Sequence, residues 1–289
     1  MKICQVADIH VRSLKYIKEY KKIFANFYEL VRKEAPDIIC ISGDLFHEKL
    51  NLSPECVNLM AEFLDTLSNI AETYIIPGNH DVAIKNKNRL DAITPIVKAL
   101  NKPTIHYDIN SCIYQLNGSV DLHAWSLVDE DNWKQPTNKD KINILMYHGS
   151  VNGCVTDLGF KLENCDIKNT EIFKMFNLGL FGDIHCRQEI SPNFWMCGSL
   201  IQQNHGESQS KGFLVHDVIS KNDIRTRFVE VPNPYPFVTY HLTEDNKLPK
   251  NIINQGNVRL IYDENTVSKS TLDKCIKLIK SKPNVQLQV

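Results

Sequence analysis

Polar side chains that can bind a cation follow short apolar runs at five places in the chain. The five stretches are VADIH (6–10), ISGDLFH (41–47), IIPGNHD (75–81), LMYHG (145–149) and LFGDIH (180–185). A single His or Asp after a strand is usually a turn residue or a helix cap. Here five of the ten histidines occupy such positions, and ligands of open α/β sheets bind where several strands end at one edge. The repetition therefore predicts one shared site rather than five separate turns.

The side chains in these stretches are carboxylates, imidazoles and one amide, without a thiolate. That donor set suits Mn²⁺, Fe²⁺ or Mg²⁺ at least as well as Zn²⁺. One ion cannot use so many donors, whereas two ions about 3.5–4 Å apart, bridged by one carboxylate, would use them all. Such a pair activates water and stabilises the oxygens that enter and leave phosphorus. The pattern predicts a dinuclear phosphoester hydrolase, with Mn²⁺ as the expected metal and Mg²⁺, Fe²⁺ or Zn²⁺ as alternatives.

These stretches need a scaffold of alternating strands and helices, and the first hundred residues have that pattern. Strands are predicted over 2–7, 37–42 and 73–77, and helices over 20–35, 56–70 and 89–100, the last interrupted near Pro95. Ser53 is the expected N-cap of the second helix, with Pro54 at its first helical position. This order predicts an α/β fold with a mostly parallel sheet covered by helices.

From about residue 104 the chain becomes rich in strands. Strands are predicted over 111–116, 120–127, 142–147 and 178–181, with a short helix near 169–177, and antiparallel strands over 194–200, 211–218 and 224–231. The segment PNPYP (232–236) is predicted to be a linker, because proline cannot donate to a sheet ladder. We therefore divide the chain into a main domain at 1–231 and a small β/α unit at 237–289.

Composition narrows the class of protein. The net charge is −1 and the pI about 6.8, so contact with nucleic acid would depend on a local basic patch. Nine cysteines without a CxxC pair favour a reducing compartment over a disulfide framework. The chain starts with a predicted strand rather than a signal peptide, and no apolar run approaches the roughly 20 residues of a membrane span. We expect a cytoplasmic or nucleoid protein, or one inside a host cell if its origin is viral, and not a secreted one.

The motifs DxH, GDxxH, GNHD, HG and the final GxxH resemble those of the calcineurin-like metallophosphoesterases. Two more specific stretches, GDLFH and GSLIQQNHGE followed by KGFLVHDV, resemble the SbcD branch of DNA repair nucleases, of phage or viral type. The resemblance covers residues 1–231. It implies a two-sheet αββα sandwich, followed by a DNA-binding capping domain of which residues 237–289 would be the beginning. It also implies a nuclease that processes DNA double-strand breaks by a two-metal mechanism.

The resemblance assigns roles to individual residues. The first metal would be held by Asp8, His10 and His185, and the second by Asn79, His148 and Asp183, with Asp44 bridging the two ions. The remaining roles concern the phosphate: His80 would be the general acid, Asp81 would orient it, and His47 would contact the phosphate.

Asp183 departs from the family pattern, which has GHxH where this chain has GDIH. An aspartate can still bind the second metal through oxygen, and would favour Mn²⁺ or Mg²⁺ there. In the alternative, Asp183 lies outside the ligand shell and the second site is weak. We expect direct ligation, because the register of the motif is otherwise kept.

Basic residues follow the first and third motifs, where a DNA backbone would pass. The expected phosphate contacts are Arg12, Lys15, Lys85, Lys87 and Arg89. The resemblance also implies double-stranded ends and single-stranded DNA as substrates, a homodimer, and an ABC ATPase partner of the SbcC type. Two other functions stay open: a phosphodiesterase or phosphatase for small phosphoesters, and a DNA-end-binding scaffold with little catalysis.

Overall fold

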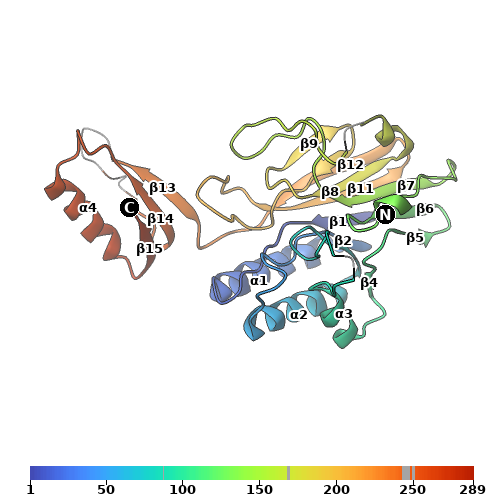
Figure 1. Ribbon diagram of the computed structural model, residues 1–289, viewed down its shortest axis with the longest axis horizontal. Helices are drawn as coiled ribbons and strands as arrows, with labels where there is room; N and C mark the ends of the chain where they lie inside the picture. Colours follow the sequence, from blue (N-terminus) through green and yellow to red (C-terminus); the bar gives the residue numbers. More distant parts are fainter. Residues whose placement is uncertain (87, 168–169, 243–247, 249–250) are drawn as a thin grey trace.

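A six-stranded sheet carries the first three of the five polar motifs, and Figure 1 shows how the labelled elements are arranged. The computed structural model describes residues 1–86, 88–167, 170–242, 248 and 251–289. The sheet has the order β12 (Asp223–Glu230), β11 (Gly212–Ser220), β1 (Lys2–Val6), β2 (Ile38–Ser42), β3 (Glu72–Ile76) and β4 (Ile105–Tyr107). Strands β1 to β4 are parallel, and β11 and β12 extend the sheet with antiparallel pairing. The mostly parallel sheet is therefore confirmed.

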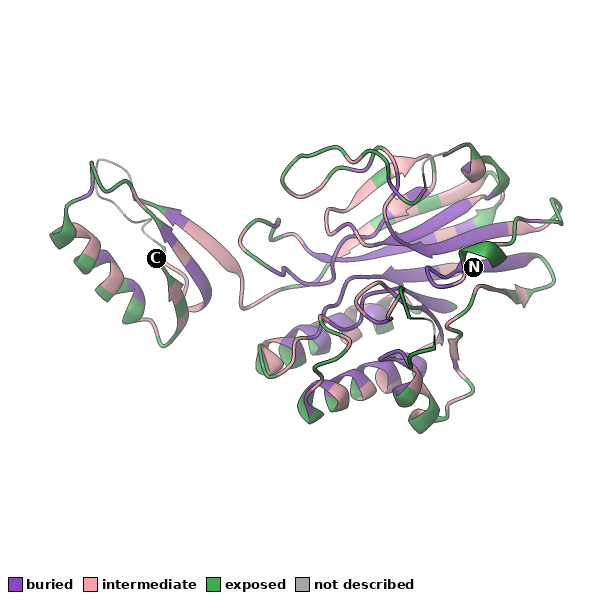
Figure 2. Ribbon diagram, viewed as in Figure 1, coloured by how far each residue is buried: buried purple, intermediate pink, exposed green. Residues whose placement is uncertain are grey.

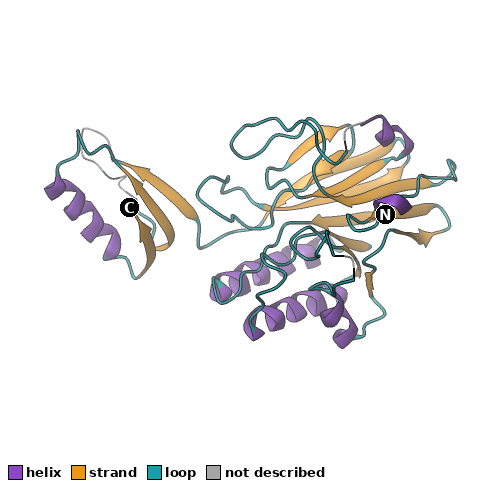
Figure 3. Ribbon diagram, in the orientation of Figure 1, coloured by secondary structure: helices purple, strands orange, loops and turns teal. Residues whose placement is uncertain are grey.

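Three helices cover the outer face of this sheet: α1 (Ile17–Glu34), α2 (Pro54–Ser68) and α3 (Thr94–Leu100) (Figure 3). The Ser53 side chain accepts a hydrogen bond from the amide of Cys56, which confirms the predicted cap of α2. The helix predicted over 89–100 is shorter in the structure, where it covers Thr94–Leu100. The helix does not continue through Pro95 but begins beside it, because proline has no amide to donate and fits the first turn of a helix.

A second six-stranded sheet carries the other two motifs. Its order is β5 (Cys112–Asn117), β6 (Val120–Trp125), β7 (Ile142–His148), β8 (Leu178–Gly182), β10 (Phe194–Met196) and β9 (Gln188–Ser191). The 3₁₀ helices η1 (Glu130–Asn132) and η2 (Thr170–Met175) lie in its connections, η2 where a helix was expected.

The predicted antiparallel strand at 194–200 was wrong in part. Strand β10 is short and pairs in parallel with β8, although it is antiparallel to β9. After β10 the chain crosses to the first sheet, where Ser199 forms an isolated bridge with Ala7 and the amide of Leu200 donates to the carbonyl of Ala7. This crossing brings the GSL stretch to the end of β1.

Most residues of the central strands are buried (Figure 2), and apolar clusters lie between the two sheets and between the first sheet and its helices. The core between the sheets packs Ile3, Cys40 and Ile76 against Ile144 and Leu180. The core between the first sheet and the helices is built on residues such as Phe24, Phe27 and Phe63. With both faces of the first sheet buried, its strands read as continuous apolar runs.

A third, parallel sheet of three strands follows residues 232–236, and Figure 1 shows it apart from the two large sheets. It consists of β13 (Phe237–His241), β14 (Gln255–Ile261) and β15 (Asn284–Gln288), with α4 (Lys269–Lys280) between the last two. It has an apolar cluster of its own, which includes Tyr240, Val258 and Ile279. Among the described helices, none combines the length and apolar character needed to cross a membrane.

Candidate metal centre

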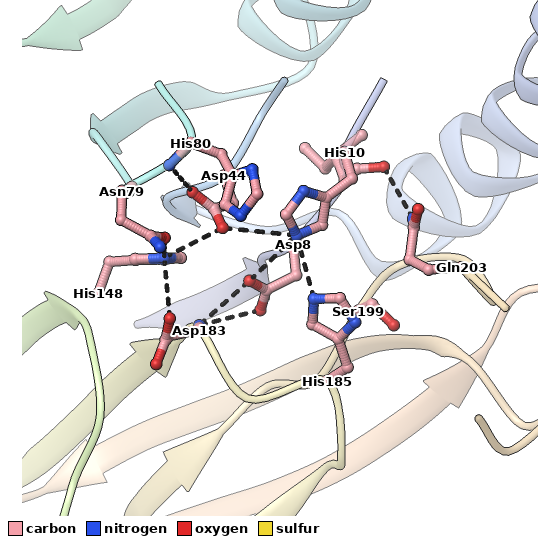
Figure 4. Close-up of polar contacts among 12 residues, drawn as sticks. Asp8, His10, Asp44, Asn79, His80, His148, Asp183, His185, Ser199 and Gln203 are labelled. Atoms are coloured by element: carbon pink, nitrogen blue, oxygen red, sulfur yellow. Dashed lines mark hydrogen bonds and ion pairs between the residues drawn. The ribbon is translucent and has the colours of Figure 1, made fainter. Parts of the chain in front are cut away.

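All seven predicted metal ligands meet where β1, β2, β3, β7 and β8 end (Figure 4). Three of them, Asp8, His10 and His185, form one group whose donor atoms lie within 4.8 Å of one another. The Nε2 atoms of His10 and His185 are 3.0 Å apart. This group comes from the loops after β1 and β8, which are far apart in sequence, and it matches the predicted ligands of the first metal.

A second group contains Asp8, Asp44 and His148, again within 4.8 Å. Asp44 Oδ2 is 3.4 Å from His10 Nε2 and 3.4 Å from His148 Nε2, so it stands midway between the two groups. Asn79 Oδ1 lies 3.2 Å from His148 Nε2 and joins the second group. This placement suits the predicted bridging role of Asp44, and Asp8 also lies within reach of both groups.

Asp183 lies at the rim of the second group. Its Oδ1 is 3.8 Å from His148 Nε2, its side chain is 24% exposed, and it belongs to neither three-residue group. Its amide donates to both carboxylate oxygens of Asp8, at 3.1 and 3.2 Å. Asp183 therefore positions Asp8 through its backbone, whatever its side chain binds.

The backbone bends sharply at the ligands. Asp8, His10, Asp44 and Asp183 all have positive φ angles, of 52°, 48°, 54° and 98°. Residues other than glycine seldom adopt this region, and they cluster there at functional sites. A Cβ on Gly78 would lie 2.1 Å from Asp44 Oδ1, so only glycine lets the third loop approach Asp44 this closely.

In the centre, buried carboxylates lie beside buried imidazoles, and both burial and the neighbouring charges shift their pKa values. Burial raises the pKa of Asp8 to about 6 and lowers the pKa of His10 to about 3. Burial also opposes the charge on Asp44, but His148 and His10 outweigh it and hold the pKa of Asp44 below its usual value. Burial alone would lower the pKa of His148, yet the carboxylates, Asp44 first, raise it well above the usual value. A proton on His148 therefore offsets part of the carboxylate charge, and a cation bound at its Nε2 would displace that proton.

The donors fit divalent metal ions. His148 Nδ1 donates to the carbonyl of Ser42 at 2.7 Å, so a cation that displaces the proton on Nε2 would meet the lone pair of that nitrogen. That lone pair faces the acceptor oxygens of Asp44 and Asn79, and a cation would satisfy all three. The amide of Asn79 can instead turn its nitrogen toward Asp44, and a bound cation would select the oxygen.

His80 reaches the centre from the loop after β3. Its amide donates to Asp44 Oδ1 at 2.9 Å, and its Nδ1 donates to the carbonyl of His47 at 2.6 Å. Its side chain lines a pocket of about 190 Å³ with Asp44, Asp183 and His185. Nε2 of His80 is thus left as the nitrogen that can exchange a proton with a substrate.

Asp81 does not orient the His80 ring by a direct hydrogen bond, which corrects the expected role. Its carboxylate accepts from the amides of Leu45, Phe46 and Gly78 at 3.2, 3.0 and 2.9 Å. Asp81 instead ties the loop after β2 to the loop after β3. It affects His80 only through the backbone that carries it.

Glu207 is a buried part of the centre to which the sequence analysis gave no role. Its Oε1 accepts from His185 Nδ1 at 2.8 Å, and its Oε2 accepts from Lys211 Nζ at 3.0 Å. Lys211 also donates to the carbonyl of His185 at 2.9 Å. Burial opposes the charge of Glu207, but the hydrogen bond from His185, together with the nearby Lys211, lowers its pKa to about 2. The only signal in the sequence was the Glu that closes GSLIQQNHGE.

The four predicted DNA contacts that the structure describes do not gather at one place. Arg12 lines the metal pocket, whereas Arg89 lines a separate hollow with Thr94 and Tyr107. Lys15 and Lys85 are exposed and line neither of these hollows. Lys87 lies outside the described residues.

Comparison with known proteins extends this description. The sequence model of the calcineurin-like phosphoesterases matches residues 1–187, which contain all seven predicted ligands. Uncharacterized protein R555 of Acanthamoeba polyphaga mimivirus is 34% identical over 280 residues, 91% of this chain but only 20% of that protein. The SbcD subunit of the SbcCD nuclease from Staphylococcus epidermidis is 24% identical over 276 residues, 79% of this chain and 69% of that protein. Its counterpart in Staphylococcus saprophyticus is 24% identical over 263 residues, 79% of this chain and 68% of that protein.

Proposed function

Because the chain belongs to the calcineurin-like phosphoesterase family, we propose that it is a metal-dependent nuclease that hydrolyses DNA phosphodiesters. The observation that carries the proposal is the convergence of seven carboxylate, imidazole and amide side chains at one sheet edge, beside a pocket that four of them line. Hydrolysis of a charged diester needs a site of this kind, where fixed groups meet the charge that develops on phosphorus oxygens.

Two divalent ions, Mn²⁺ in our proposal, would be held by Asp8, His10 and His185 on one side and by Asn79, His148 and Asp183 on the other, with Asp44 between them. When bound, such ions polarise the phosphate and lower the pKa of the attacking water. The protein supplies the orientation of these donors: Ser42 and Glu207 hold the imidazoles of His148 and His185 with their Nε2 atoms toward the other ligands.

His80 is the proposed general acid. As a water oxygen bonds to phosphorus, the bond from phosphorus to the leaving oxygen breaks, the leaving oxygen takes a proton from His80 Nε2, and the attacking water gives up a proton to the solvent. The hydrogen bond from Nδ1 to the carbonyl of His47 fixes the ring for this transfer. The amide of His80 also donates to Asp44, which ties the acid to the metal ligands.

The alignment with the two staphylococcal nuclease proteins favours DNA as the substrate. It extends over 79% of this chain, beyond residue 187 where the family match ends. The small unit adds a local basic surface to a chain with a net charge of −1: residues 251–289 hold six Lys and Arg against three Asp and Glu. Lys274, Lys277 and Lys280 are exposed on α4. Such a surface suits contacts with phosphates that do not depend on base sequence.

We further propose the arrangement that the SbcD resemblance implies. Residues 1–231 form the nuclease domain, 232–236 the linker and 237–289 a capping domain that holds DNA. The partners are a second copy of the chain and an SbcC-type ATPase, and the role is the processing of DNA ends in repair, recombination or replication.

The test is incubation of the purified protein with end-labelled duplex and single-stranded DNA, with Mn²⁺, Mg²⁺ or EDTA. We expect cleavage with Mn²⁺ and none with EDTA. His80→Ala should keep Mn²⁺ binding and lose cleavage by a factor of about 10²–10⁴. His106→Gln, which changes a histidine bonded to Glu72 on the first sheet, is the matched control. Cleavage by His80→Ala at the wild-type rate would reject the acid assignment.

A second function, hydrolysis of small phosphoesters, is favoured by the near-neutral charge of the whole chain. A chromogenic diester such as bis(p-nitrophenyl) phosphate, assayed beside the DNA, separates the two. Activity on the small ester without activity on any DNA would replace the nuclease proposal with this one. Metal binding without activity on either substrate would indicate a DNA-end-binding scaffold.

The role of Asp183 has its own test. If its carboxylate holds the second ion, Asp183→Asn should lower the Mn²⁺ stoichiometry from two ions to one in titration calorimetry, and Asp183→His should change the order of metal preference. Unchanged stoichiometry and preference in both variants would show that only the Asp183 backbone serves the centre.

A further inference from the structure

One positively charged side chain, that of Arg12, lines the metal pocket. Arg12 follows the Asp8–His10 motif, and of the residues that line the 190 Å³ pocket it alone has a permanent positive charge. The ion pairs found among the described residues do not include Arg12. Its charge is therefore available to an anion in the pocket.

The backbone fixes Arg12 beside His47. The amide of Val11 donates to the carbonyl of Leu45 at 2.9 Å, and the amide of His47 donates to the carbonyl of Val11 at 3.0 Å. Val11 and Phe46 form an isolated parallel bridge between the same two loops. Arg12 and His47 therefore leave neighbouring positions of two joined loops, one after β1 and the other after β2.

The contact between the two side chains has a defined direction. Arg12 Nη1 is 2.9 Å from His47 Nε2, and a guanidinium can only donate. His47 Nε2 is therefore the acceptor. It cannot also donate to a phosphate or bind an ion, although His47 forms a compact group with His10 and His80. The contact uses one N–H of Arg12, and a guanidinium has five.

On the premise of the proposed function, we propose that Arg12 is a catalytic residue that binds the phosphate being hydrolysed, and that His47 is a positioning residue for its guanidinium. This assignment differs from direct contact between His47 and the phosphate. A guanidinium meets two phosphate oxygens at once with parallel N–H donors, which a lysine cannot do. Negative charge grows on those oxygens as the water oxygen bonds to phosphorus, so Arg12 stabilises the transition state more than the bound substrate.

The experiment compares Arg12→Gln and Arg12→Lys with Arg32→Gln, an exposed arginine in the last turn of α1. With bis(p-nitrophenyl) phosphate and saturating Mn²⁺, we expect kcat to fall about 10²–10³-fold in Arg12→Gln and less in Arg12→Lys. Mn²⁺ affinity by calorimetry should stay within about threefold of wild type in both. The inhibition constant of inorganic phosphate should rise in Arg12→Gln, a measure of anion binding that does not depend on turnover.

A double-mutant cycle tests the positioning role. His47→Ala keeps the backbone carbonyl that His80 uses and removes only the ring that holds Arg12. It should lower kcat by about tenfold in the wild type and by less than about twofold in Arg12→Gln, because the two residues act as one unit. His47→Gln, whose amide oxygen can accept from Arg12, should restore part of the loss.

Several results would overturn the proposal: a kcat of Arg12→Gln within about threefold of wild type, loss of Mn²⁺ binding together with activity, or equal effects of His47→Ala in both backgrounds. A wild-type protein that hydrolyses the small diester with this dependence on Arg12 but cleaves no DNA would reject the nuclease and keep Arg12. A wild-type protein that binds Mn²⁺ and hydrolyses neither substrate would reject both.

Discussion

At the scale of single residues, the centre depends on groups that hold the ligands as much as on the ligands. A histidine ring that is free to rotate holds a metal ion weakly, so the ring of His185 needs a partner that fixes its orientation. Glu207 fixes the ring through Nδ1, and Lys211 fixes both Glu207 and the carbonyl of His185. Removing such a partner commonly weakens metal binding without disturbing the fold.

Glu207→Gln should therefore lower Mn²⁺ affinity at the first site by about 10–100-fold. Calorimetric titration of the metal-free protein measures this directly. Glu62→Gln on α2, whose partner Asn58 is exposed, is the control and should bind Mn²⁺ like wild type. Equal affinities in Glu207→Gln and wild type would show that the Glu207–His185 contact does not position the ring.

At the scale of elements, β1 and β11 share a buried polar contact away from the metals. His216 on β11 is fully buried, with Nδ1 at 2.8 Å from Thr226 Oγ1 and Nε2 at 3.0 Å from Gln5 Oε1. Gln5 also donates to the carbonyl of Phe181 on β8 and so links the two sheets. Burial lowers the pKa of His216 to about 3.

The stability of the protein should fall in acid because of His216. Below its ordinary pKa of about 6.5 the unfolded chain binds a proton that the folded chain rejects until about pH 3. The free energy of unfolding should then decrease by up to about 1.4 kcal/mol for each pH unit between these values. Urea unfolding of wild type and His216→Gln from pH 7 to pH 4 measures it: the variant should be less stable at pH 7 but show a shallower slope. Parallel pH profiles would contradict the assignment to His216, and His241→Gln on β13 is the exposed control.

Much of the site could be predicted from sequence at this scale, and particular residues show why. His148 is the last residue of its strand, and Asp8, Asp44, Asn79 and Asp183 come within three residues of the end of theirs, so strand order alone places them at one edge. The predicted family is confirmed by the match over residues 1–187, and the predicted two-sheet fold by the two six-stranded sheets.

What the sequence did not reveal depends on contacts between distant loops. The pairs Arg12–His47 and His185–Glu207 join segments 35 and 22 residues apart, and no local pattern records them. The role of Asp81 was predicted wrongly for a similar reason. In the GNHD motif Asp81 is adjacent to His80, but the motif gives no sign of the three backbone amides that donate to its carboxylate. The parallel pairing of β10 with β8 was not predicted, because a strand of three residues has too little periodicity to indicate its direction in the sheet.

At the scale of the whole molecule, the chain has one set of hydrophobic cores around the two large sheets and a separate core in the small unit, and residues 232–236 connect them. The apolar clusters of the large sheets end at Val231, and the cluster of the small unit begins at Tyr240. The polar contact across the junction includes Gln202, which donates to the carbonyl of Phe237 and accepts from its amide. The catalytic centre uses only residues before the junction.

A chain that ends at residue 231 should therefore keep hydrolysis of the small diester and lose affinity for DNA. We expect kcat within about threefold of the full chain, and binding to a duplex weaker by about tenfold or more at low salt, since the basic surface on α4 is gone. Fluorescence anisotropy with labelled duplex measures the binding. A milder change, Lys274→Gln with Lys277→Gln in the full chain, should lower the salt dependence of binding. Unchanged DNA affinity in both proteins would remove the small unit from the substrate surface.

The positive φ angles at the ligands have a consequence for the stability of the fold. Each strained residue costs about 1–3 kcal/mol in the metal-free chain, and glycine relieves that cost. Asp183, with φ at 98° and a pKa raised by burial, would be the position most easily relaxed. Asp183→Gly should raise the melting temperature in EDTA by about 2–4 °C while lowering activity, and a lower melting temperature would contradict this. Part of the free energy that bound ions contribute would then go to holding this strained backbone, so the protein should gain more stability from Mn²⁺ than the Asp183→Gly variant.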